Sequence, residues 1–279
     1  MKWELIAMDM DGTLLKSDKT VSKRSVEALR AAVERGVAVI PATGRVARML
    51  PKPVAALRGV RYAITSNGAL VVDLQERRAV YRNLMTLRQA ERLLALLDSY
   101  GLFAEAYCGG VSYSEKGALA LAVKAGLPEN VLAYIMESQR FVESLSGEIS
   151  RQPFPPEKVN VPYVPVELRA ELRERILSLS GLSVTSSEWE NLEINAASCS
   201  KGAALRFLCT KLAVSPSRVL AVGDGDNDES MLRYAGMAVA MENASPALKA
   251  AADFVTGTND RDGVAYAVEK FVLAGEDCG

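Results

Sequence analysis

The chain has 279 residues, of which 49% are hydrophobic and 24% charged, and its formal net charge is −1. This balance is ordinary for a globular protein of one large or two smaller domains, and it shows no basic excess that would indicate a nucleic-acid or membrane partner. The chain contains no histidine, which excludes a Ser-His-Asp triad, a histidine general base and a histidine-ligated zinc. Its four cysteines form no CxxC pair and no apolar run approaches the ~18 residues that span a bilayer, so we expect a reduced, cytoplasmic setting.

Strands and helices alternate along the first third of the chain. We predict strands over 3–8, 37–40 and 62–65, a helix over 22–35 that ends at Gly36, and a hairpin formed by 69–72 and 79–81. Alternation of this kind predicts a parallel sheet with right-handed crossovers.

The pattern changes after about residue 83. Short alternating segments occur over 103–107, 111–114, 141–145 and 159–164, with helices expected over 87–100, near 129–138 and over 166–180. Clustered strands with few crossovers favour an α+β unit with an antiparallel sheet.

The strand–helix alternation then resumes with a helix over 201–212 and a strand over 218–222. We therefore predict an α/β fold. Its doubly wound, Rossmann-like parallel sheet would form from residues 1–83 and 195–279, and an α+β domain over 84–194 would be inserted into it.

Residues able to carry chemistry follow the predicted strands or open the next helix. They are Asp9 and Asp11, Thr43 and Gly44, Ser66 to Gly68, Lys201, and the run from Asp224 to Asp228. Because the carboxyl ends of parallel strands share one edge of a sheet, we expect these loops to converge.

The first pair of acids has a possible role in phosphoryl transfer. Asp9 should be ionised at neutral pH, and a carboxylate can attack phosphorus to give an aspartyl-phosphate if Mg²⁺ cancels the charge repulsion. Asp11 could protonate the leaving oxygen and later take a proton from water, and a neighbouring carboxylate should raise its pKa. Taken alone, two turn-capping aspartates are an equally good interpretation.

The other loops supply complementary groups, each with an ordinary structural alternative. Thr43 and Gly44 at a helix start could bind an anion, or Thr43 could be a plain helix cap. Lys201 at a helix N-terminus is unfavourable for the helix dipole unless it faces a phosphate or Asp9, although a solvated lysine is as common. The run from Asp224 to Asp228 suits a hard cation or a solvated turn, but not an EF-hand, because Glu229 stands where that loop requires glycine.

Cys199 is a poor candidate for a nucleophile. Six residues separate it from Arg206, a near miss for the spacing of a cysteine phosphatase. A small, partly buried thiol is the favoured interpretation.

Together these motifs resemble the haloacid dehalogenase superfamily of phosphatases, and within it the Cof-like group with a type IIB cap. The resemblance covers essentially the whole chain and rests on five motifs: Asp9-Met10-Asp11-Gly12-Thr13-Leu14, Ala42-Thr43-Gly44-Arg45, Ser66-Asn67-Gly68-Ala69, Ser200-Lys201-Gly202 and Gly223-Asp224-Gly225-Asp226-Asn227-Asp228.

The resemblance implies a role for each matched position. Asp9 would be the nucleophile and a metal ligand, and Asp11 the general acid/base, with the metal ligand in that stretch often assigned to the Asp11 backbone carbonyl. Thr43, Gly44 and Lys201 would hold the phosphoryl group. Asp224 would bind Mg²⁺ directly, Asp228 would support the metal, and Asn227 would contact phosphate or Asp9. The inserted block would be a cap that closes over the substrate.

Two departures from the family pattern carry expectations of their own. Glu242 stands where glycine commonly precedes Asn-Ala, so the loop at Asn243 should lie less close to the site. The segment 195–199 replaces a short hinge that usually contains proline or glycine, so the sequence does not predict how the cap opens.

The resemblance therefore implies a Mg²⁺-dependent phosphatase whose partner is a small phosphomonoester, such as a sugar phosphate or a phosphorylated cofactor, with no nucleic acid and no membrane. A phosphomutase is the alternative, and its second phosphate site would draw on Arg88, Arg92, Arg140 and Arg151. A non-enzymatic phospho-acceptor protein is a third hypothesis. Candidates for substrate selection are Tyr107, Cys108, Gly109, Gly110 and Tyr113, with core-packing tyrosines as the alternative.

Overall fold

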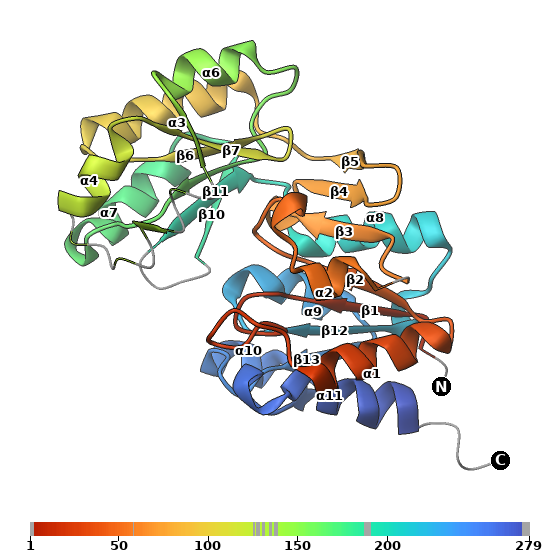
Figure 1. Ribbon diagram of the computed structural model, residues 1–279. Helices are drawn as coiled ribbons and strands as arrows, with labels where there is room; N and C mark the ends of the chain where they lie inside the picture. Colours follow the sequence, from red (N-terminus) through yellow and green to blue (C-terminus); the bar gives the residue numbers. More distant parts are fainter. Residues whose placement is uncertain are drawn as a thin grey trace. The chain divides into compact units, whose positions relative to one another are not determined.

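The computed structural model describes residues 3–57, 59–124, 126, 129, 132–133, 136, 139–186 and 191–274. Most of the helix predicted near 129–138, and Cys278, lie outside these residues. The chain divides into two compact units, Met1–Arg82 with Ser200–Gly279, and Asn83–Cys199 (Figure 1). The predicted inserted block, 84–194, falls within the second unit.

A five-stranded parallel sheet forms the centre of the first unit. Its strand order is β14 (Phe254–Val255), β13 (Met237–Ala240), β12 (Val219–Gly223), β1 (Leu5–Met8) and β2 (Ala38–Pro41). Every pairing is parallel, and Leu5 lies in register with both Val219 and Ala38. The predicted doubly wound α/β fold is thereby confirmed, with β1 inside the sheet between β12 and β2.

Alternate residues of β1 enter two separate hydrophobic clusters. Ile6 and Met8 pack with residues of α1 (Lys23–Glu34) and α11 (Gly263–Val268). Leu5 and Ala7 pack with residues of α8 (Lys201–Leu212) and α9 (Glu229–Tyr234). Helices therefore cover both faces of the sheet, as a buried parallel strand that is apolar throughout requires.

Shorter elements complete the first unit. They are η1 (Ala47–Met49), α2 (Lys52–Ala55), η2 (Ser66–Gly68), η3 (Pro216–Arg218), η4 (Asp226–Asp228), α10 (Pro246–Ala251), η5 (Asn259–Arg261) and the π-helical turn η6 (Glu269–Leu273).

The strand over 62–65 belongs to a second, smaller sheet of the same unit. β3 (Tyr62–Thr65), β4 (Leu70–Asp73) and β5 (Arg78–Arg82) form an antiparallel sheet. A parallel bridge between Ala42 and Ile64 links it to the end of β2. Asp73 closes the β4–β5 turn by accepting from the backbone N–H groups of Gln75 (3.0 Å) and Glu76 (3.1 Å).

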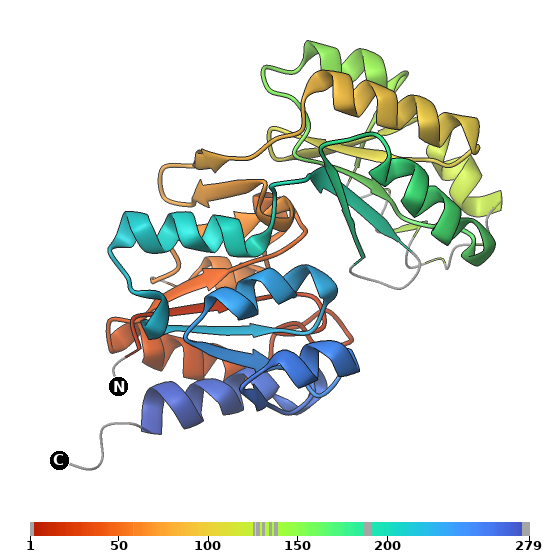
Figure 2. The ribbon, with the colours of Figure 1, turned by 180° about the vertical axis from the view of Figure 1, so that it is seen from behind.

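In the part of the second unit that the structure describes, a six-stranded sheet is accompanied by four helices. The strand order is β10 (Leu182–Thr185), β11 (Leu192–Ala196), β9 (Lys158–Val161), β6 (Glu105–Cys108), β7 (Val111–Glu115) and β8 (Gln139–Val142). The helices are α3 (Leu87–Ser99), α4 (Ala118–Lys124), α6 (Leu145–Arg151) and α7 (Val166–Leu177). Figure 2 shows α3 and α7 lying along one face of this sheet.

The predicted antiparallel sheet is correct for every pairing except one. β7 and β8 are parallel, and the connection between them begins with α4, whereas a tight hairpin turn would have made them antiparallel. The strand predicted over 141–145 ends early, since Ser144 caps α6 by accepting from the N–H of Gly147 at 3.2 Å. α4, α6 and β10 were not predicted.

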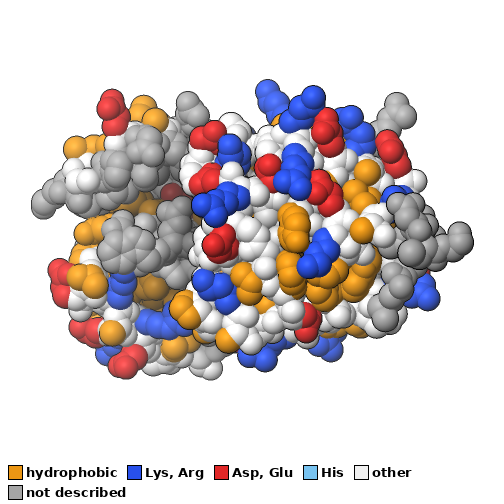
Figure 3. All heavy atoms as spheres, turned by 90° about the horizontal axis from the view of Figure 1, so that it is seen from below, with side chains coloured by type: hydrophobic (Ala, Val, Ile, Leu, Met, Phe, Trp, Pro, Cys, Tyr) orange, Lys and Arg blue, Asp and Glu red, His pale blue; other side chains and the backbone are white. Residues whose placement is uncertain are grey.

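Among the described residues, no helix combines the length and the apolar composition needed to cross a membrane. On the face shown in Figure 3, the described Lys and Arg side chains are interspersed with Asp and Glu, without a broad patch of one sign. This mixture agrees with the net charge of −1.

Candidate active site

Lys201 is the first residue of α8, and its side chain is completely buried. Its ammonium donates to Oδ1 of Asp9 and to Oδ1 of Asp228, each at 2.6 Å. Ser200 caps the helix by accepting from the N–H of Ala203 at 3.1 Å. The prediction that this lysine faces Asp9 is confirmed, and the charge pair offsets the unfavourable position of a cation at a helix N-terminus.

The turn Ser66–Gly68 packs directly against the start of α8. Gly68 has φ +97°, and a Cβ added there would lie 2.2 Å from the carbonyl oxygen of Ser200. Ser66 and Asn67 are also left-handed, with φ of 51° and 60°. Only a residue without a side chain fits at Gly68, so this motif helps to set the position of Lys201.

Three carboxylates gather around the lysine. Asp9, Asp224 and Asp228 each offer one oxygen, and these oxygens all lie within 4.8 Å of one another. The other oxygen of Asp228 accepts from the N–H groups of Asp224 (2.9 Å) and Gly225 (3.0 Å), which fixes its orientation. Asp224 in turn accepts from the hydroxyl of Thr13 at 2.6 Å.

The charge balance of this cluster calls for a further cation. Three carboxylates face one ammonium, and an all-oxygen donor set suits a hard divalent ion. Burial raises the pKa of Asp9 well above its usual value; Lys201 opposes this change and the charges of Asp228 and Asp224 add to it. Burial is also the main reason that the pKa of Asp224 rises to about 6. A bound cation would relieve the cost of holding these groups ionised.

The loop at Asn243 lies close to the cluster, contrary to expectation. Asn243 Nδ2 donates to the carbonyl oxygen of Gly12 (2.8 Å) and to Oδ2 of Asp224 (3.3 Å). A Cβ on Gly12, which has φ +76°, would lie 2.2 Å from the same Asp224 oxygen. Replacement of the usual glycine by Glu242 therefore has not moved this loop away.

Asp11 has different neighbours from those expected. Its carboxylate is held by Arg45, with Nε donating at 2.6 Å and a terminal nitrogen at 2.5 Å, and by Lys19 at 3.0 Å. Burial acts to raise the pKa of Asp11, but the hydrogen bonds and charges of Arg45 and Lys19 outweigh it, and the pKa is lowered. The prediction of a raised pKa was wrong, because it considered only the neighbouring carboxylate. The Asp11 carboxylate also lies outside the three-carboxylate cluster.

The segment after β2 does not begin a helix as predicted. Thr43 and Gly44 lie in an irregular turn, and the next helical residues are Ala47–Met49, a 3-10 turn with Val46 as its N-cap. The buried hydroxyl of Thr43 accepts from the N–H of Arg45 at 3.1 Å. That bond leaves the hydroxyl hydrogen available for an anion.

Asn227 contacts the turn Ser66–Gly68 rather than Asp9. Its Nδ2 donates to Oδ1 of Asn67 at 3.1 Å. This amide pair ties the acidic loop after β12 to the turn that packs against α8.

The residues proposed for substrate selection divide between the two faces of the second unit's sheet. Tyr107 lies on one face, whereas Cys108 and Tyr113 lie on the other, and the Tyr113 hydroxyl accepts from Gln152 at 3.2 Å. Gly109 and Gly110 form the β6–β7 turn with positive φ. The arginines considered for a second phosphate site are all exposed and lie on three elements, α3 (Arg88 and Arg92), β8 (Arg140) and α6 (Arg151).

Four contributors to the site were not assigned a role from the sequence. Thr13 and Asn243 fix Asp224, while Arg45 and Lys19 hold Asp11. Thr13, Arg45 and Asn243 lie inside or beside the family motifs, so their positions along the chain could have indicated a role in the site. Lys19 had none, because its contact with Asp11 depends on a left-handed backbone with φ 63° at Lys19 itself.

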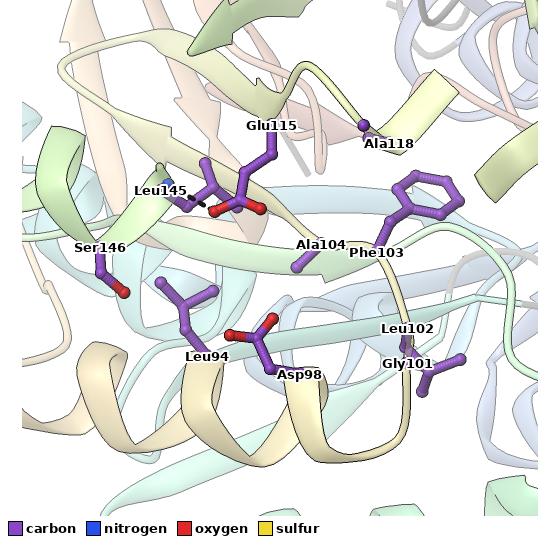
Figure 4. Close-up of a pocket in the computed structure, with 11 residues that line it drawn as sticks. Leu94, Asp98, Gly101, Leu102, Phe103, Ala104, Glu115, Ala118, Leu145 and Ser146 are labelled. Atoms are coloured by element: carbon purple, nitrogen blue, oxygen red, sulfur yellow. Dashed lines mark hydrogen bonds between the residues drawn. The ribbon is translucent and has the colours of Figure 1, made fainter. Parts of the chain in front are cut away.

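A cavity of about 190 Å³ lies elsewhere, within the second unit, and is lined by residues that include Leu94, Phe103 and Leu145. Figure 4 shows the carboxylates of Asp98 and Glu115 pointing into it. Glu115 already accepts from the N–H of Leu145 at 2.9 Å, at the start of α6. None of the residues predicted to bind phosphate or metal lines this cavity.

Comparison with known proteins agrees with this geometry. A family model described as haloacid dehalogenase-like hydrolase matches residues 6–268. Among curated proteins of Bacillus subtilis, 5-amino-6-(5-phospho-D-ribitylamino)uracil phosphatase YcsE is 30% identical over 270 residues, covering 97% of this chain and 96% of the relative. Phosphatase YwpJ is 31% identical, with 94% and 98% covered.

Solved structures give the same result. A haloacid dehalogenase-like hydrolase from B. subtilis superposes with a TM-score of 0.82 at 30% identity, covering 96% of this chain and 99% of that one. One from Bacteroides thetaiotaomicron gives 0.80 at 27% identity, with the same coverage.

Proposed function

Since this chain belongs to the family of haloacid dehalogenase-like hydrolases, we propose that it is a Mg²⁺-dependent phosphatase that hydrolyses small phosphomonoesters through an aspartyl-phosphate on Asp9. One observation carries the proposal: a completely buried lysine joins Asp9 to Asp228 beside a third carboxylate, Asp224. Positioning and charge neutralisation provide nearly all of the catalysis in phosphoryl transfer, and this cluster offers both.

The metal would be held by Asp9, Asp224 and Asp228. When bound, Mg²⁺ supplies the positive charge that lets a carboxylate approach a phosphate ester. Lys201 keeps Asp9 oriented and favours its ionised form, because two hydrogen bonds tie the ammonium to Asp9 and Asp228.

Hydrolysis then proceeds in two steps. An Asp9 oxygen attacks phosphorus, the bond from phosphorus to the ester oxygen breaks, and that oxygen takes a proton from Asp11. Water next attacks the phosphoryl group and gives its proton to Asp11, and the bond from phosphorus to Asp9 breaks to release inorganic phosphate. We propose that Thr43, with the neighbouring Gly44, and Asn227 contact the phosphoryl oxygens, alongside Lys201.

The ion pair between Asp11 and Arg45 bears on the order of these events. The ionised Asp11 is already suited to accept a proton in the second step. Donating one in the first step requires protonation, which Arg45 and Lys19 oppose. We therefore propose that Asp11 leaves Arg45 before the ester bond breaks.

We further propose that the second unit, which contains the predicted cap domain 84–194, selects the substrate. The relative YcsE is named as the phosphatase of a phosphoribitylamino-uracil, which supports a sugar phosphate or phosphorylated cofactor as the substrate class here. The phosphomutase alternative receives no support, since its four candidate arginines are exposed and dispersed. A reduced, cytoplasmic setting is also proposed, in keeping with the free thiols of Cys108 and Cys209.

The test is phosphate release from phenyl phosphate with Mg²⁺. Asp9→Asn should reduce kcat by at least about 10³-fold, as expected for loss of a nucleophile, and EDTA should abolish activity reversibly. Asp11→Asn should accumulate a phosphorylated Asp9, visible as a mass increase of the intact protein. Asp18→Asn, which alters an exposed carboxylate bonded to Thr20, is the matched control.

Full activity of Asp9→Asn would contradict the covalent mechanism. Activity that survives EDTA would contradict the metal requirement.

A further inference from the structure

An exposed loop of the first unit delivers one of the two cations that hold Asp11. Residues 16–20, which we call the Lys19 loop, close on themselves through a hydrogen bond from the N–H of Lys16 to the carbonyl oxygen of Thr20 at 2.9 Å. Lys19 has φ 63°, and its ammonium lies 3.0 Å from Oδ1 of Asp11. The position of this ammonium therefore depends on the conformation of the loop.

The contact between Lys19 and Asp11 cannot order the loop by itself. The side chain of Lys19 is 55% exposed and that of Asp11 is 29% exposed. An ion pair in such a position contributes little stability, because water screens the two charges and a long side chain loses rotamer freedom. The left-handed backbone of Lys19 costs further free energy. Another part of the molecule must therefore hold the loop in place.

The turn η5 (Asn259–Arg261) provides this support. The two oxygens of Asp260 accept from the N–H of Ser17 at 2.9 Å and from its hydroxyl at 2.6 Å. Asn259 Nδ2 donates to the carbonyl oxygen of Leu15 at 2.9 Å. The hydrogen bonds from Ser17 lower the pKa of Asp260, so the acceptor is an ionised carboxylate at neutral pH, and hydrogen bonds to such an acceptor are stronger than neutral ones.

The chain around η5 is itself firmly placed. The N–H of Gly263 donates to the carbonyl oxygen of Thr258 at 3.0 Å, and the hydroxyl of the buried Thr256 donates to the carbonyl oxygen of Gly263 at 2.7 Å. A Cβ on Gly263 would lie 2.2 Å from the carbonyl oxygen of Gly257, so the backbone is in close contact on both sides of the turn. Asp260 therefore holds Ser17 from a rigid support.

The same turn is connected to the three-carboxylate cluster. The N–H of Asn259 donates to Oδ1 of Asn243 at 3.2 Å, and Asn243 in turn donates to Asp224. Thus η5 is linked to Asp11 through the Lys19 loop and to Asp224 through Asn243.

We infer that Asp260 is a positioning residue, which holds the Lys19 loop so that Lys19 keeps the Asp11 carboxylate in one orientation. This inference rests on the proposed phosphatase activity and adds to it a residue outside the five family motifs. Loss of the orientation should slow the second step of hydrolysis most, because a water molecule and the Asp11 carboxylate have to be placed together. In the first step Asp11 leaves Arg45 in any case. Without Asp260, phosphorylated Asp9 should therefore last longer.

Trypsin tests the support of the loop without any substrate. The Lys19 loop contains two cleavage sites for this protease, after Lys16 and after Lys19. We expect native Asp260→Ala to be cut there at least about tenfold faster than the wild type, because cleavage follows the population of the open loop. Asp260→Asn should be cut at the wild-type rate, since its amide can accept from the N–H of Ser17 and donate to the hydroxyl. Arg261→Ala, at an exposed position of the same turn, is the matched control.

Kinetics with phenyl phosphate and Mg²⁺ test the effect on Asp11. In Asp260→Ala, kcat should fall about tenfold, within the roughly 10²-fold that misplacement by about 1 Å can cost. KM should fall by the same factor, so that kcat/KM is unchanged, because only the step after formation of the aspartyl-phosphate is slowed. Quenched samples should contain a larger fraction of protein phosphorylated on Asp9, visible in the intact mass. Lys19→Met should reproduce these changes, and adding Asp260→Ala to it should have no further effect.

Three results would overturn the inference. Wild-type cleavage rates in Asp260→Ala would mean that η5 does not hold the loop. Faster cleavage with unchanged kcat would mean that the loop does not orient Asp11, and a fall in kcat/KM would place the defect before the aspartyl-phosphate forms. If the wild type itself releases no phosphate from phenyl phosphate, the proposed function fails, and trypsin alone still decides whether Asp260 holds the Lys19 loop.

Discussion

Replacing Lys201 with methionine tests whether its buried ammonium is what allows Asp9 and Asp228 to lie side by side. Methionine has a similar length and no charge, so the change removes two 2.6 Å hydrogen bonds at a completely buried position. Removing one partner of a buried ion pair typically costs about 3–5 kcal/mol, because the remaining charge is left uncompensated. At roughly 2–4 °C per kcal/mol for domains of 150–250 residues, we expect the melting temperature to fall by roughly 6–20 °C in EDTA.

The loss should depend on the metal. In Lys201→Met the cluster keeps three carboxylates with no cation, so a divalent ion should become its main source of positive charge. Ligand binding stabilises the folded state by about 2.7 kcal/mol at one hundred times Kd. Saturating Mg²⁺ should therefore raise the melting temperature of the variant by much more than that of the wild type. The kcat of the variant should remain low even with Mg²⁺ bound.

The assay is thermal denaturation followed by circular dichroism, in EDTA and in Mg²⁺. Lys211→Met, at an exposed position of the same helix, is the matched control and should melt like the wild type. Adding Asp228→Asn to Lys201→Met should recover part of the loss, because one uncompensated charge is removed. If Lys201→Met and Lys211→Met have the same melting temperature in EDTA, the buried charge pair does not contribute the stability assigned to it.

Three further predictions concern other parts of the first unit and the cysteines. Gly68→Ala should lower both stability and kcat, because the added Cβ meets the Ser200 carbonyl. Gly36 also has positive φ but has open space around it, so Gly36→Ala should cost only about 1–2 kcal/mol of backbone strain. Equal losses of stability in the two variants would refute the packing argument. Hydrogen bonds from Arg61 and from turn N–H groups lower the pKa of Asp73 although burial acts to raise it. The carboxylate therefore stabilises the fold above its unfolded pKa of about 3.9, and urea titrations should show Asp73→Asn about 1 kcal/mol less stable at pH 7, with the gap closing as pH falls below 4. Burial raises the pKa of Cys199 to about 12, so Cys199→Ser should keep full activity and the thiol should resist iodoacetamide at pH 8; rapid alkylation would contradict this.

Convergence of the acids was predictable because it depends on strand direction alone. Asp9 and Asp224 each follow a buried apolar strand, and parallel neighbours deliver their carboxyl ends to one edge. Lys201 was predictable for a related reason: a lysine at a helix N-terminus is unfavourable without an anion. Both inferences needed only the pattern along the chain.

The partners of Asp11 were not predictable in the same way. Arg45 reaches it from the loop after β2, and Lys19 from a left-handed turn. Which of several nearby basic side chains takes a carboxylate depends on loop conformation, and loops have no periodicity to interpret. The same reason explains why the helix predicted to start at Thr43 was wrong: Thr43 caps no helix, and its hydroxyl accepts from the N–H of Arg45 within an irregular turn.

The sheet of the second unit illustrates a third limit. Segments such as Lys158–Val161 and Leu192–Ala196 alternate polar and apolar residues, which normally indicates a strand with one face in water. Burial of the polar side is a tertiary property, because it depends on what lies above the sheet. The strands were therefore largely predictable, and the enclosure of their charges was not.

Placing β1 between β2 and β12 has a consequence for how the protein is made. On a ribosome, β1 can pair with β2 as soon as residue 41 emerges, but its other edge stays open until β12, Val219–Gly223, has been synthesised. Strands β6 to β11 follow one another without interruption by the first unit, so the inserted sheet can form first. Asp9 is thus translated well before its partners in the cluster, Lys201, Asp224 and Asp228. A nascent or truncated chain ending before residue 219 carries an unpaired apolar strand edge, a site for aggregation, and chaperone dependence should be greatest at that stage of synthesis.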